Sequence, residues 1–346
     1  MSQTSLQDPI TRNKTRMVQS FDIDDLKLYE RFSKLFIQKH RLGDGGDGIV
    51  HAYEHKSSKV LVAVKTPLPS TSSSAMSKAI KRLEVEIENL SILQQHEHIV
   101  GMLAFSYIPV VPAIFLPLCE LGDLNNYVSI WKHKQGKQGK VIKHTSEVAI
   151  WKFLHDMALA LDYLHNKCGN YGYTHNDIKP DNILVDLPNG WKKEDGVPDE
   201  PVFRLTDFAR MTRNHPTESA QPTRFCGTPE YAPPFSEQGT LRPSGDIWAL
   251  GSTLQTLALG IYPIQSHEAF VADRRREGKA APILVDRGAW KRSYWRHLIP
   301  TTFRPLSATK EELMKDFDVQ DSIVIEEFYP NRPWEHKPYS KQLDEC

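Results

Sequence analysis

The chain has 346 residues, which at roughly 150 residues per domain fits two domains or one large domain of two lobes. It carries 43 Lys and Arg against 43 Asp and Glu, so its net charge is zero and bulk charge gives no support for a nucleic-acid or acidic-membrane partner. Hydrophobic residues make up 40% and charged residues 25%, which is ordinary for a globular protein and excludes wholesale disorder.

The first third of the chain is predicted to be mainly β-structure with one helix, after a polar N-terminal extension at 1–35. Alternating or β-branched runs predict strands from residue 36 and at 49–53, 60–64, 99–105 and 113–118. Pro67–Ser77 is predicted to be a loop because it is rich in Ser, Thr and Pro. The next segment, Lys78–Gln95, places apolar residues at helical spacing and predicts the helix.

The rest of the chain is predicted to be mostly helical, with helices at Val148–His165, Asp246–Leu259 and Lys310–Phe317. Two segments are predicted to be surface loops, the lysine-rich Lys132–Lys143 and the Pro-, Gly- and charge-rich Leu187–Pro201.

Cysteine usage and the N-terminus bear on location. The cysteines Cys119, Cys168, Cys226 and Cys346 are widely spaced and form no C-x-x-C pair, which favours free thiols in a reducing compartment. Residues 1–16 lack the apolar core of a secretory signal. We therefore expect a cytoplasmic protein with no membrane partner, and the nucleus is left open as a second location.

A glycine motif near the N-terminus predicts a phosphate-binding turn. Gly43, Gly45 and Gly48 form G-x-G-x-x-G, but the strand-like residues 49–53 follow it, whereas a dinucleotide fingerprint needs a helix there. Lys65 ends a V-A-V-K run 17 residues after Gly48. A glycine turn between two strands, followed by a lysine on the next strand, can cover a triphosphate and offer a positive charge to its α/β oxygens.

A lysine on a buried strand needs a counter-charge. The following helix offers Glu84, Glu86 and Glu88. The spacing to the apolar residues of that helix favours Glu86, while Glu84 and Glu88 better fit a solvated helix face.

The strongest polar cluster is the run T-H-N-D-I-K-P-D-N at 174–182. Asp177 can accept or orient a hydroxyl proton, Lys179 can neutralise a transferring phosphoryl group, and Asn182 can ligate a divalent metal. Asp207 follows 25 residues after Asn182, at the end of a predicted strand, where a carboxylate suits Mg²⁺ bridging two phosphates.

Taken together, these motifs resemble those of eukaryotic protein kinases of the Ser/Thr branch, as do C-G-T-P-E-Y at 226–231 and D-I-W-A-L-G at 246–251. The resemblance implies an α+β, bilobal kinase fold over residues 36–330. A small β-rich N-lobe with one main helix is expected at about 36–118 and a larger, mostly helical C-lobe at about 119–330, followed by a tail at 331–346. In the family, the position of Asp246 ties down the backbone of the catalytic loop.

The resemblance also implies ATP with Mg²⁺, or Mn²⁺ as an alternative metal, as cofactors. Leu116 matches the gatekeeper, Pro117 to Cys119 match the hinge, and Asp123 matches a ribose contact; Pro117 keeps its carbonyl and Cys119 its N–H for adenine. The implied nucleotide-binding residues are Leu42, Gly43, Asp44, Gly45, Gly46, Asp47, Gly48, Ile49, Val50, Ala63, Lys65, Leu116, Pro117, Cys119, Asp123, Asn182 and Asp207. The implied catalytic residues are Asp177, Lys179, Lys65 and Glu86, and the implied metal ligands are Asn182 and Asp207.

Three positions depart from the family pattern. Asn176 replaces the arginine that receives a phosphorylated activation loop, so we expect activity without loop phosphorylation at Thr223 or nearby, or control by another route. Ala209 gives D-F-A in place of D-F-G, at a cost of about 1 kcal/mol if this residue needs a positive φ. Phe235 replaces a glutamate that pairs with the arginine matching Arg304, so Arg304 must find another partner or solvent.

The sequence thus predicts a monomeric Ser/Thr protein kinase that moves the γ-phosphoryl of MgATP to hydroxyls of protein substrates. Asp123 and Asp181 match acidic positions that favour arginine in the substrates of some family members, and a third such acid is missing near Thr256, so the resemblance implies a mild preference for basic substrates. One alternative is a pseudokinase scaffold that binds nucleotide without turnover, marked by the three departures. Another is a small-molecule kinase of related fold, which would lack the motifs at 226–231 and 246–251.

Overall fold

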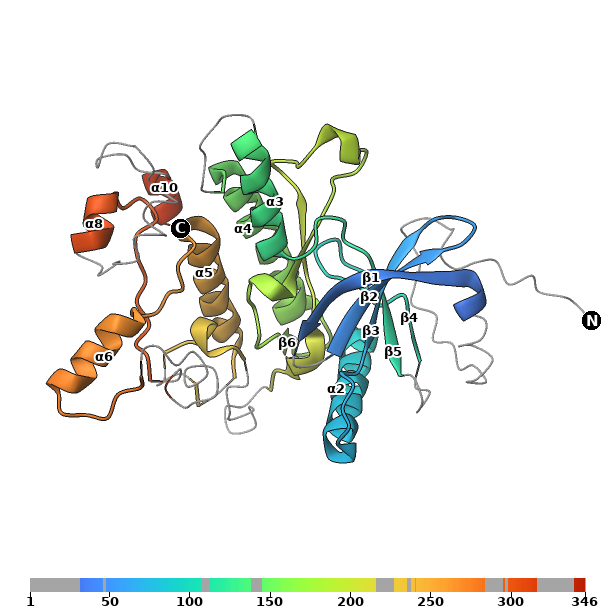
Figure 1. Cartoon of the computed structure of the whole chain (residues 1–346), viewed down its shortest axis with the longest axis horizontal. Coiled ribbons are helices and arrows are strands. Elements are labelled where there is room, and N and C mark those ends of the chain that lie inside the picture. The colour runs from blue at the N-terminus through green and yellow to red at the C-terminus, as the bar shows by residue number, and fades with distance from the viewer. Residues whose placement is uncertain are drawn as a thin grey trace, which may run out of the picture. The chain divides into compact units, whose positions relative to one another are not determined.

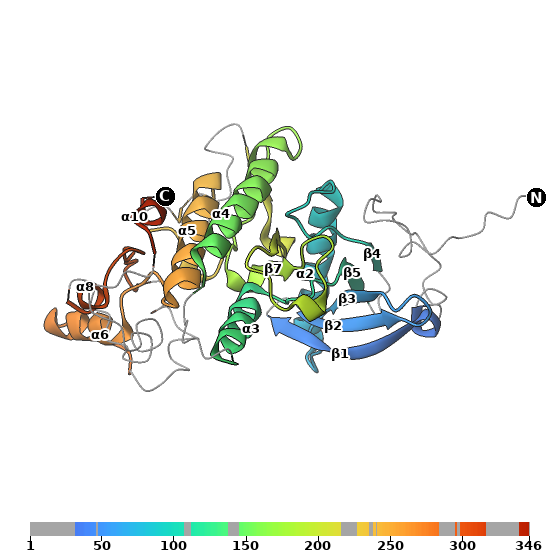
Figure 2. The same cartoon turned by 90° about the horizontal axis from the view of Figure 1, so that it is seen from above.

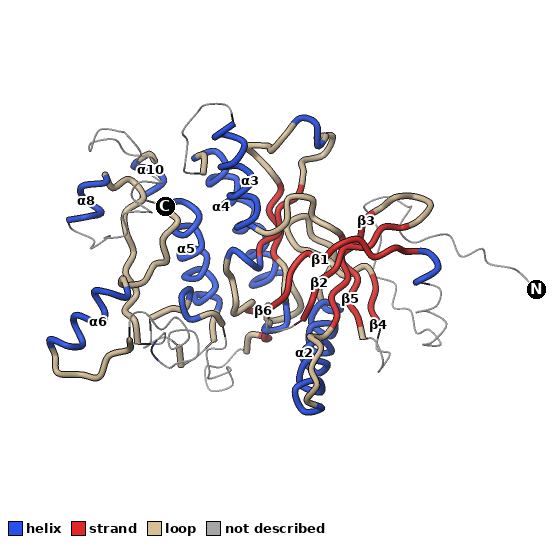
Figure 3. The backbone as a smooth tube through the Cα atoms, viewed as in Figure 1, coloured by secondary structure: helices blue, strands red, loops and turns tan. Residues whose placement is uncertain are grey.

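The computed structural model describes residues 32–45, 48–106, 112–137, 145–215, 227–234, 238–239, 241–283, 295, 298–315 and 339–345. The chain divides into two compact units. The first comprises residues 1–119 with 207–209, and the second comprises 120–206 with 210–346. Strands (red) dominate the first unit, and most of the helices (blue) belong to the second (Figure 3).

The first unit is built on a five-stranded antiparallel sheet with the strand order β1-β2-β3-β5-β4 (Figures 1 and 2). Its strands are β1 (Phe36–Gly45), β2 (Gly48–His55), β3 (Leu61–Thr66), β4 (Ala104–Ser106) and β5 (Ala113–Pro117). The strand predicted at 99–105 is wrong at its start, because β4 begins at Ala104. Ile99 and Val100 are buried, so their apolar run marks burial rather than a place in the sheet.

Helix α2 (Ser73–Ile92) packs against the sheet at β5 (Figure 1). It starts five residues earlier than predicted, because Ser72 acts as its N-cap and accepts a hydrogen bond from the Ala75 N–H. The serine-rich segment that predicted a loop therefore contains a helix start. The buried face of α2 carries Leu83 and Ile87, which anchor the helix to the unit.

The helices of the second unit are α3 (Leu124–Lys137), α4 (Glu147–Asp162), α5 (Pro243–Leu259), α6 (His267–Arg276), α8 (Lys310–Lys315) and α10 (Lys341–Asp344). The prediction of a lysine-rich loop at 132–143 is wrong for its first half, because the residues up to Lys137 belong to helix α3. Asp123 caps this helix, and Tyr127 is fully buried on it. Among the helices that the structure describes, none has the length and apolarity needed to span a membrane.

Two short ladders complete the second unit. Strand β6 (Tyr173–Thr174) pairs with β9 (Thr212–Arg213), and β7 (Ile183–Asp186) pairs with β8 (Val202–Leu205). The segment 187–201, predicted to be a surface loop, connects β7 to β8. The β6–β9 ladder brings the start of the polar run at 174–182, which corresponds to the family's catalytic loop, beside the segment that follows Asp207.

Aromatic packing fixes the β7–β8 ladder on helices α3 and α4. Phe203 on β8 meets the rings of Tyr127 and Phe153 edge to face, with centroids 5.9 and 5.5 Å away, and all three side chains are fully buried. Asp156 of α4 accepts a hydrogen bond from the Phe203 N–H at 3.1 Å. Asn182, which directly precedes β7, therefore sits on a rigid support.

The C-terminal residues 339–345, expected in a tail outside the domain, pack on the second unit. The Tyr339 hydroxyl lies 3.1 Å from the carbonyl oxygen of Thr145 and 2.9 Å from that of Ala258, so α10 is tied to the start of α4 and the end of α5. Ser340 donates its backbone N–H to the Glu147 carboxylate at 2.9 Å, and its hydroxyl also bonds that carboxylate. The folded body of the second unit thus includes residues close to the C-terminus.

Candidate active site

Within the first unit, a buried lysine lies between two carboxylates. Lys65 on β3 donates to Glu86 Oε2 at 2.6 Å and to Asp207 Oδ1 at 3.3 Å. Lys65 is 7% exposed and Glu86 is 2% exposed, whereas Glu88 is exposed and Glu84 is half-buried. The expected pairing of Lys65 with Glu86 is therefore present, and loss of either partner would leave an uncompensated buried charge.

The segment that carries Asp207 is fixed from both sides. Asp207 has a φ of 63°, in the left-handed region that Asp tolerates better than most residues. The following Phe208 is fully buried, and its carbonyl accepts a hydrogen bond from Asn89 of α2 at 2.7 Å. Ala209 is not among the described residues with positive φ, so the cost of replacing glycine does not arise in this conformation.

The glycine motif lies on the β1–β2 hairpin. Gly43 pairs with Val50, Asp44 with Ile49, and Gly45 with Gly48. Gly46 and Asp47 lie outside the described residues. A Cβ at Gly48 would stand 2.5 Å from the carbonyl oxygen of Thr66, so glycine is needed for the close approach of β2 to β3, whereas Gly43 has open space around it.

The other predicted nucleotide-binding residues of the first unit lie on neighbouring strands. Ala63 and Leu116 face each other in the β3–β5 pairing, and both are buried. Ile49, Val50 and Pro117 are half-buried, Cys119 is buried, and Leu42 is exposed. The sheet thus brings most of these residues onto β1, β2, β3 and β5.

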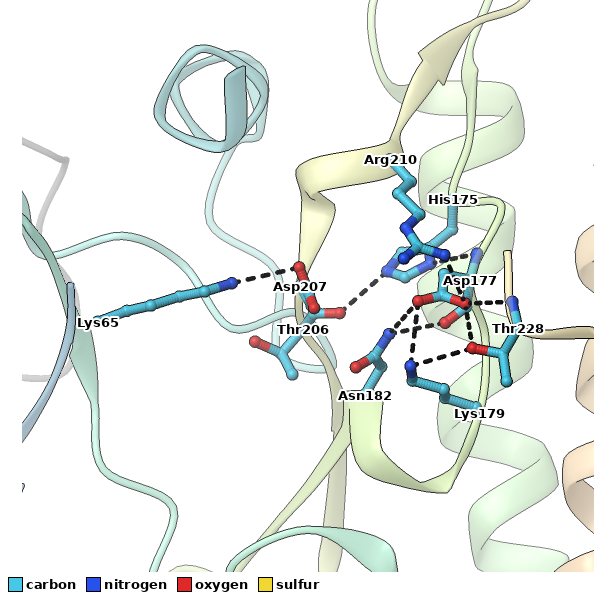
Figure 4. Close-up of polar contacts among 9 residues, drawn as sticks. All are labelled: Lys65, His175, Asp177, Lys179, Asn182, Thr206, Asp207, Arg210 and Thr228. Carbon is cyan, nitrogen blue, oxygen red and sulfur yellow. Dashed lines mark hydrogen bonds and ion pairs between the residues drawn. The ribbon is translucent and has the colours of Figure 1, made fainter. Parts of the chain in front are cut away.

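In the second unit, cationic and neutral donors surround the Asp177 carboxylate (Figure 4). Its Oδ1 accepts the N–H and the hydroxyl of Thr228, both at 2.8 Å, and lies 3.5 Å from Arg210 Nη1. Its Oδ2 accepts from Asn182 Nδ2 at 3.2 Å and lies 3.3 Å from Lys179 Nζ. Lys179 also donates to the Thr228 hydroxyl at 3.1 Å, which links these groups into one network.

Asp246, at the start of α5, holds the backbone of the catalytic loop. Its two carboxylate oxygens accept the backbone N–H groups of His175 at 2.7 Å and Asn176 at 2.9 Å, and His165 lies 2.8 Å from one of them. His175 Nε2 in turn lies 3.0 Å from the Thr206 carbonyl. The expectation that Asp246 ties down this loop is confirmed.

Asn176 cross-links three backbone segments. It has a φ of 69° and is buried, and its Nδ2 lies within 3.1 Å of the Thr174 carbonyl and within 2.9 Å of the Arg210 carbonyl and the Thr212 hydroxyl. The residue that replaces the family's arginine therefore uses its amide to join the catalytic loop to the segment after Asp207.

Asn182 in the second unit and Asp207 in the first each carry an oxygen atom of the kind that binds a hard divalent cation. Asn182 Nδ2 donates to the carbonyl oxygen of Asp177 at 2.8 Å and to its carboxylate. Because the amide nitrogen is committed to Asp177, the amide oxygen of Asn182 is directed away from it. An amide oxygen and a carboxylate are oxygen ligands of the kind that Mg²⁺ prefers.

Asp123 has a structural task in addition to its predicted ribose contact. Its Oδ1 accepts the Asn126 N–H at 2.8 Å and so caps α3. Burial raises the pKa of Asp123, and the nearby charge of Asp181 acts in the same direction, while the hydrogen bonds at the helix start oppose them.

Arg304 finds other partners, as expected. Its guanidinium is buried and donates to the carbonyl oxygens of Tyr262, Thr302 and Ile264, each at 3.0 Å. Phe235, at the position of the family's glutamate, lies outside the described residues. Three backbone carbonyls thus bind the guanidinium of Arg304.

Two members of the Asp177 network were not predicted as site residues. Thr228 belongs to the G-T-P-E-Y motif, which the sequence analysis singled out, but the motif alone did not predict that Thr228 contacts Asp177. For Arg210, the only sequence feature that could have pointed to the site is its position directly after D-F-A.

The chain belongs to the protein kinase family, since the protein kinase domain matches residues 36–315. A serine/threonine-protein kinase ATG1 from Komagataella pastoris is 28% identical over 244 residues, which cover 65% of this chain and 30% of that protein. An Aurora kinase from Debaryomyces hansenii is 27% identical over 65% of this chain and 47% of its own length. A maternal embryonic leucine zipper kinase from Danio rerio is 23% identical over 88% of this chain and 38% of its own length. The chain therefore spans less than half the length of each of these three relatives.

Proposed function

We propose that the protein is a serine/threonine protein kinase that transfers the γ-phosphoryl group of MgATP to hydroxyls of protein substrates. The observation that carries the proposal is the Asp177 carboxylate, which Thr228, Asn182 and Lys179 hold in one orientation. Relatives named as serine/threonine-protein kinases support the choice of acceptor. Family membership supports the use of ATP and a divalent metal.

In this proposal, Asp177 orients the acceptor hydroxyl and takes its proton as the oxygen attacks phosphorus. A positioned carboxylate of this kind contributes about 10²–10⁴-fold to a rate. Lys179, which lies beside Asp177 in the second unit, balances the charge on the transferring group.

The first unit supplies the groups that hold the nucleotide. The glycines of the β1–β2 hairpin cover the phosphates, and Lys65, held by Glu86, orients them. Leu116, Pro117 and Cys119 receive adenine through the backbone groups that they keep. Asn182 and Asp207 are the proposed Mg²⁺ ligands, with Mn²⁺ as an alternative, and the bound metal neutralises phosphate charge.

Regulation follows from Asn176. Its amide is engaged with neighbouring groups, and position 176 carries no guanidinium to bind a phosphate. We therefore propose activity that does not require phosphorylation of the activation segment. We further propose that the enzyme is monomeric and cytoplasmic. The segment itself, at 216–226, lies outside the described residues.

The test is transfer of labelled phosphate from MgATP by protein first treated with a phosphatase, using matched peptides with Ser, Thr or Tyr as acceptor. We expect label on the Ser and Thr peptides and none on the Tyr peptide. Lys65→Met abolishes transfer, while Lys56→Met, which removes an exposed lysine, leaves it unchanged. Binding of MgATP without transfer to any acceptor would contradict the proposal and favour the nucleotide-binding scaffold.

A further inference from the structure

We propose that Thr174 and Asn214 form a positioning pair, which holds the catalytic loop in the conformation that phosphoryl transfer needs. The Thr174 hydroxyl donates to Asn214 Oδ1 at 2.6 Å, and both residues are buried. They lie 40 positions apart in the chain, and both belong to the second unit. The proposal rests on the proposed role of Asp177, which follows Thr174 by three residues in the same loop.

The pair stands at one end of a seam between residues 172–176 and 210–214. The β6–β9 ladder forms the middle of this seam. Beside the pair, the Asn214 N–H donates to the Gly172 carbonyl at 3.0 Å. The side-chain amide of Asn176 holds the other end. The seam therefore joins the catalytic loop to the segment 210–214 through hydrogen bonds between uncharged groups.

The bond between Thr174 and Asn214 favours the joined seam. The hydroxyl and the amide oxygen satisfy each other in a place that is shielded from water. Valine at position 174 would keep the shape of threonine but put a methyl group against the amide oxygen, which would lose its donor. A buried polar atom that loses its partner destabilises the arrangement that buries it. Loss of the hydroxyl therefore shifts the equilibrium toward a separated seam.

Thr174 also connects the seam to the backbone that carries Asp177. Its carbonyl accepts from Asn176 Nδ2 at 3.1 Å, and the next residue, His175, donates its N–H to Asp246. A shift of Thr174 therefore moves the segment from which Asp177 projects. Transfer requires the Asp177 carboxylate within hydrogen-bond reach of the acceptor hydroxyl, so such a shift lowers the rate of the chemical step.

The test measures amide hydrogen exchange and steady-state kinetics, with a Ser peptide and MgATP, for Thr174→Val and Thr174→Ser. The serine variant keeps the hydroxyl and the valine variant removes it. The matched control is Thr253→Val, because Thr253 is fully buried and its hydroxyl donates to the Ala249 carbonyl within the same helix at 2.8 Å. The control thus removes a buried hydroxyl that does not join distant segments.

We expect Thr174→Val to speed exchange of the Asn214 N–H by about five- to hundredfold, the change in opening equilibrium that follows when a buried group loses its partner. We also expect its kcat to fall by about tenfold, because a small misplacement of a reacting group slows transfer strongly. KM for ATP stays unchanged, since Lys65 and Glu86 pair within the first unit. Thr174→Ser and Thr253→Val keep the wild-type exchange at Asn214 and the wild-type kcat.

Wild-type exchange at Asn214 in Thr174→Val overturns the proposal, because the bond then does not hold the seam. Faster exchange with an unchanged kcat also overturns it, as does an equal fall in kcat in Thr174→Ser or Thr253→Val. If Thr174→Val does not fold, Asn214→Ala removes the other partner of the same bond and is judged by the same two measurements. Absence of transfer by the wild type contradicts the proposed function and the positioning role together, whereas wild-type turnover with an unchanged kcat in Thr174→Val contradicts the positioning role alone.

Discussion

Replacing Asn176 by alanine and by glycine separates the two tasks of this residue in the catalytic loop. The side-chain amide lies within hydrogen-bond distance of three acceptors, and the backbone adopts a φ of 69°. Alanine removes the bonds and keeps a Cβ in the left-handed region, without the local hydrogen bonding that lets asparagine adopt it. Glycine removes the same bonds but adopts that conformation without steric cost.

The expected losses of stability follow from this geometry. An amide NH₂ has two hydrogens, so at most two of the three acceptors are bonded at once. At about 0.5–1.5 kcal/mol each, these bonds contribute about 1–3 kcal/mol. In the left-handed conformation alanine bears a steric cost of about 1–2 kcal/mol, while glycine bears only about 0.5–1 kcal/mol of backbone entropy. We therefore expect the alanine variant to be the less stable of the two, by roughly 0.5–1 kcal/mol.

Urea unfolding followed by fluorescence and circular dichroism measures both variants, with the exposed Asn125 replaced by alanine as the control. The control should stay within about 0.5 kcal/mol of the wild type. Equal stability of the alanine and glycine variants would refute the argument from φ. A loss below about 0.5 kcal/mol in both would refute the argument that the amide cross-links the loop.

Three further predictions concern the glycine hairpin and the C-terminal segment. Gly48→Ala should lower the melting temperature, because its Cβ meets a backbone oxygen at 2.5 Å, whereas Gly43→Ala, in open space, should not; equal melting temperatures would contradict this. Tyr339→Phe should destabilise the protein by about 1–3 kcal/mol in urea unfolding, since its hydroxyl serves buried carbonyls, and a neutral result would mean that α10 is not anchored. Partial burial favours the neutral form of Glu147, but hydrogen bonds from Ser340 outweigh this effect and lower the pKa of Glu147 below the ordinary 4.5. The contact therefore stabilises the fold above pH 4.5, and this stabilisation is lost as the pH falls through the lowered pKa. The stability difference between the wild type and Ser340→Ala should therefore be largest near neutral pH and shrink in acid, and a pH-independent difference would argue against an ionised Glu147.

Local sequence patterns predicted the helices and strands whose apolar residues recur at a regular spacing. The strands flanking the glycine turn and the face of α2 that carries Glu86 follow from alternation and helical spacing. The start of α2 did not, because the serine-rich segment before it fits a loop as well as a helix cap. Helix α3 was missed because lysines and glycines mask its few buried residues, such as Tyr127.

Contacts between distant segments were beyond local reasoning. Asn176 and Arg210 are 34 residues apart, and nothing in either neighbourhood says that one holds the carbonyl of the other. Tyr339 reaches Thr145 across 194 residues, so the docking of the C-terminal segment depends on how α4 and α5 fold. By contrast, the interaction of Asp246 with the catalytic-loop backbone was predicted through the family resemblance and is present.

The measurement that tests the central claim most directly is phosphoryl transfer by Asp177→Asn at a MgATP concentration that saturates it. The variant keeps a side chain of the same shape but loses the carboxylate that takes the hydroxyl proton. We expect MgATP to raise its melting temperature as it does for the wild type, while the transfer rate falls by about 10²–10⁴-fold. Transfer at the wild-type rate would contradict the assignment of Asp177 as the group that activates the acceptor.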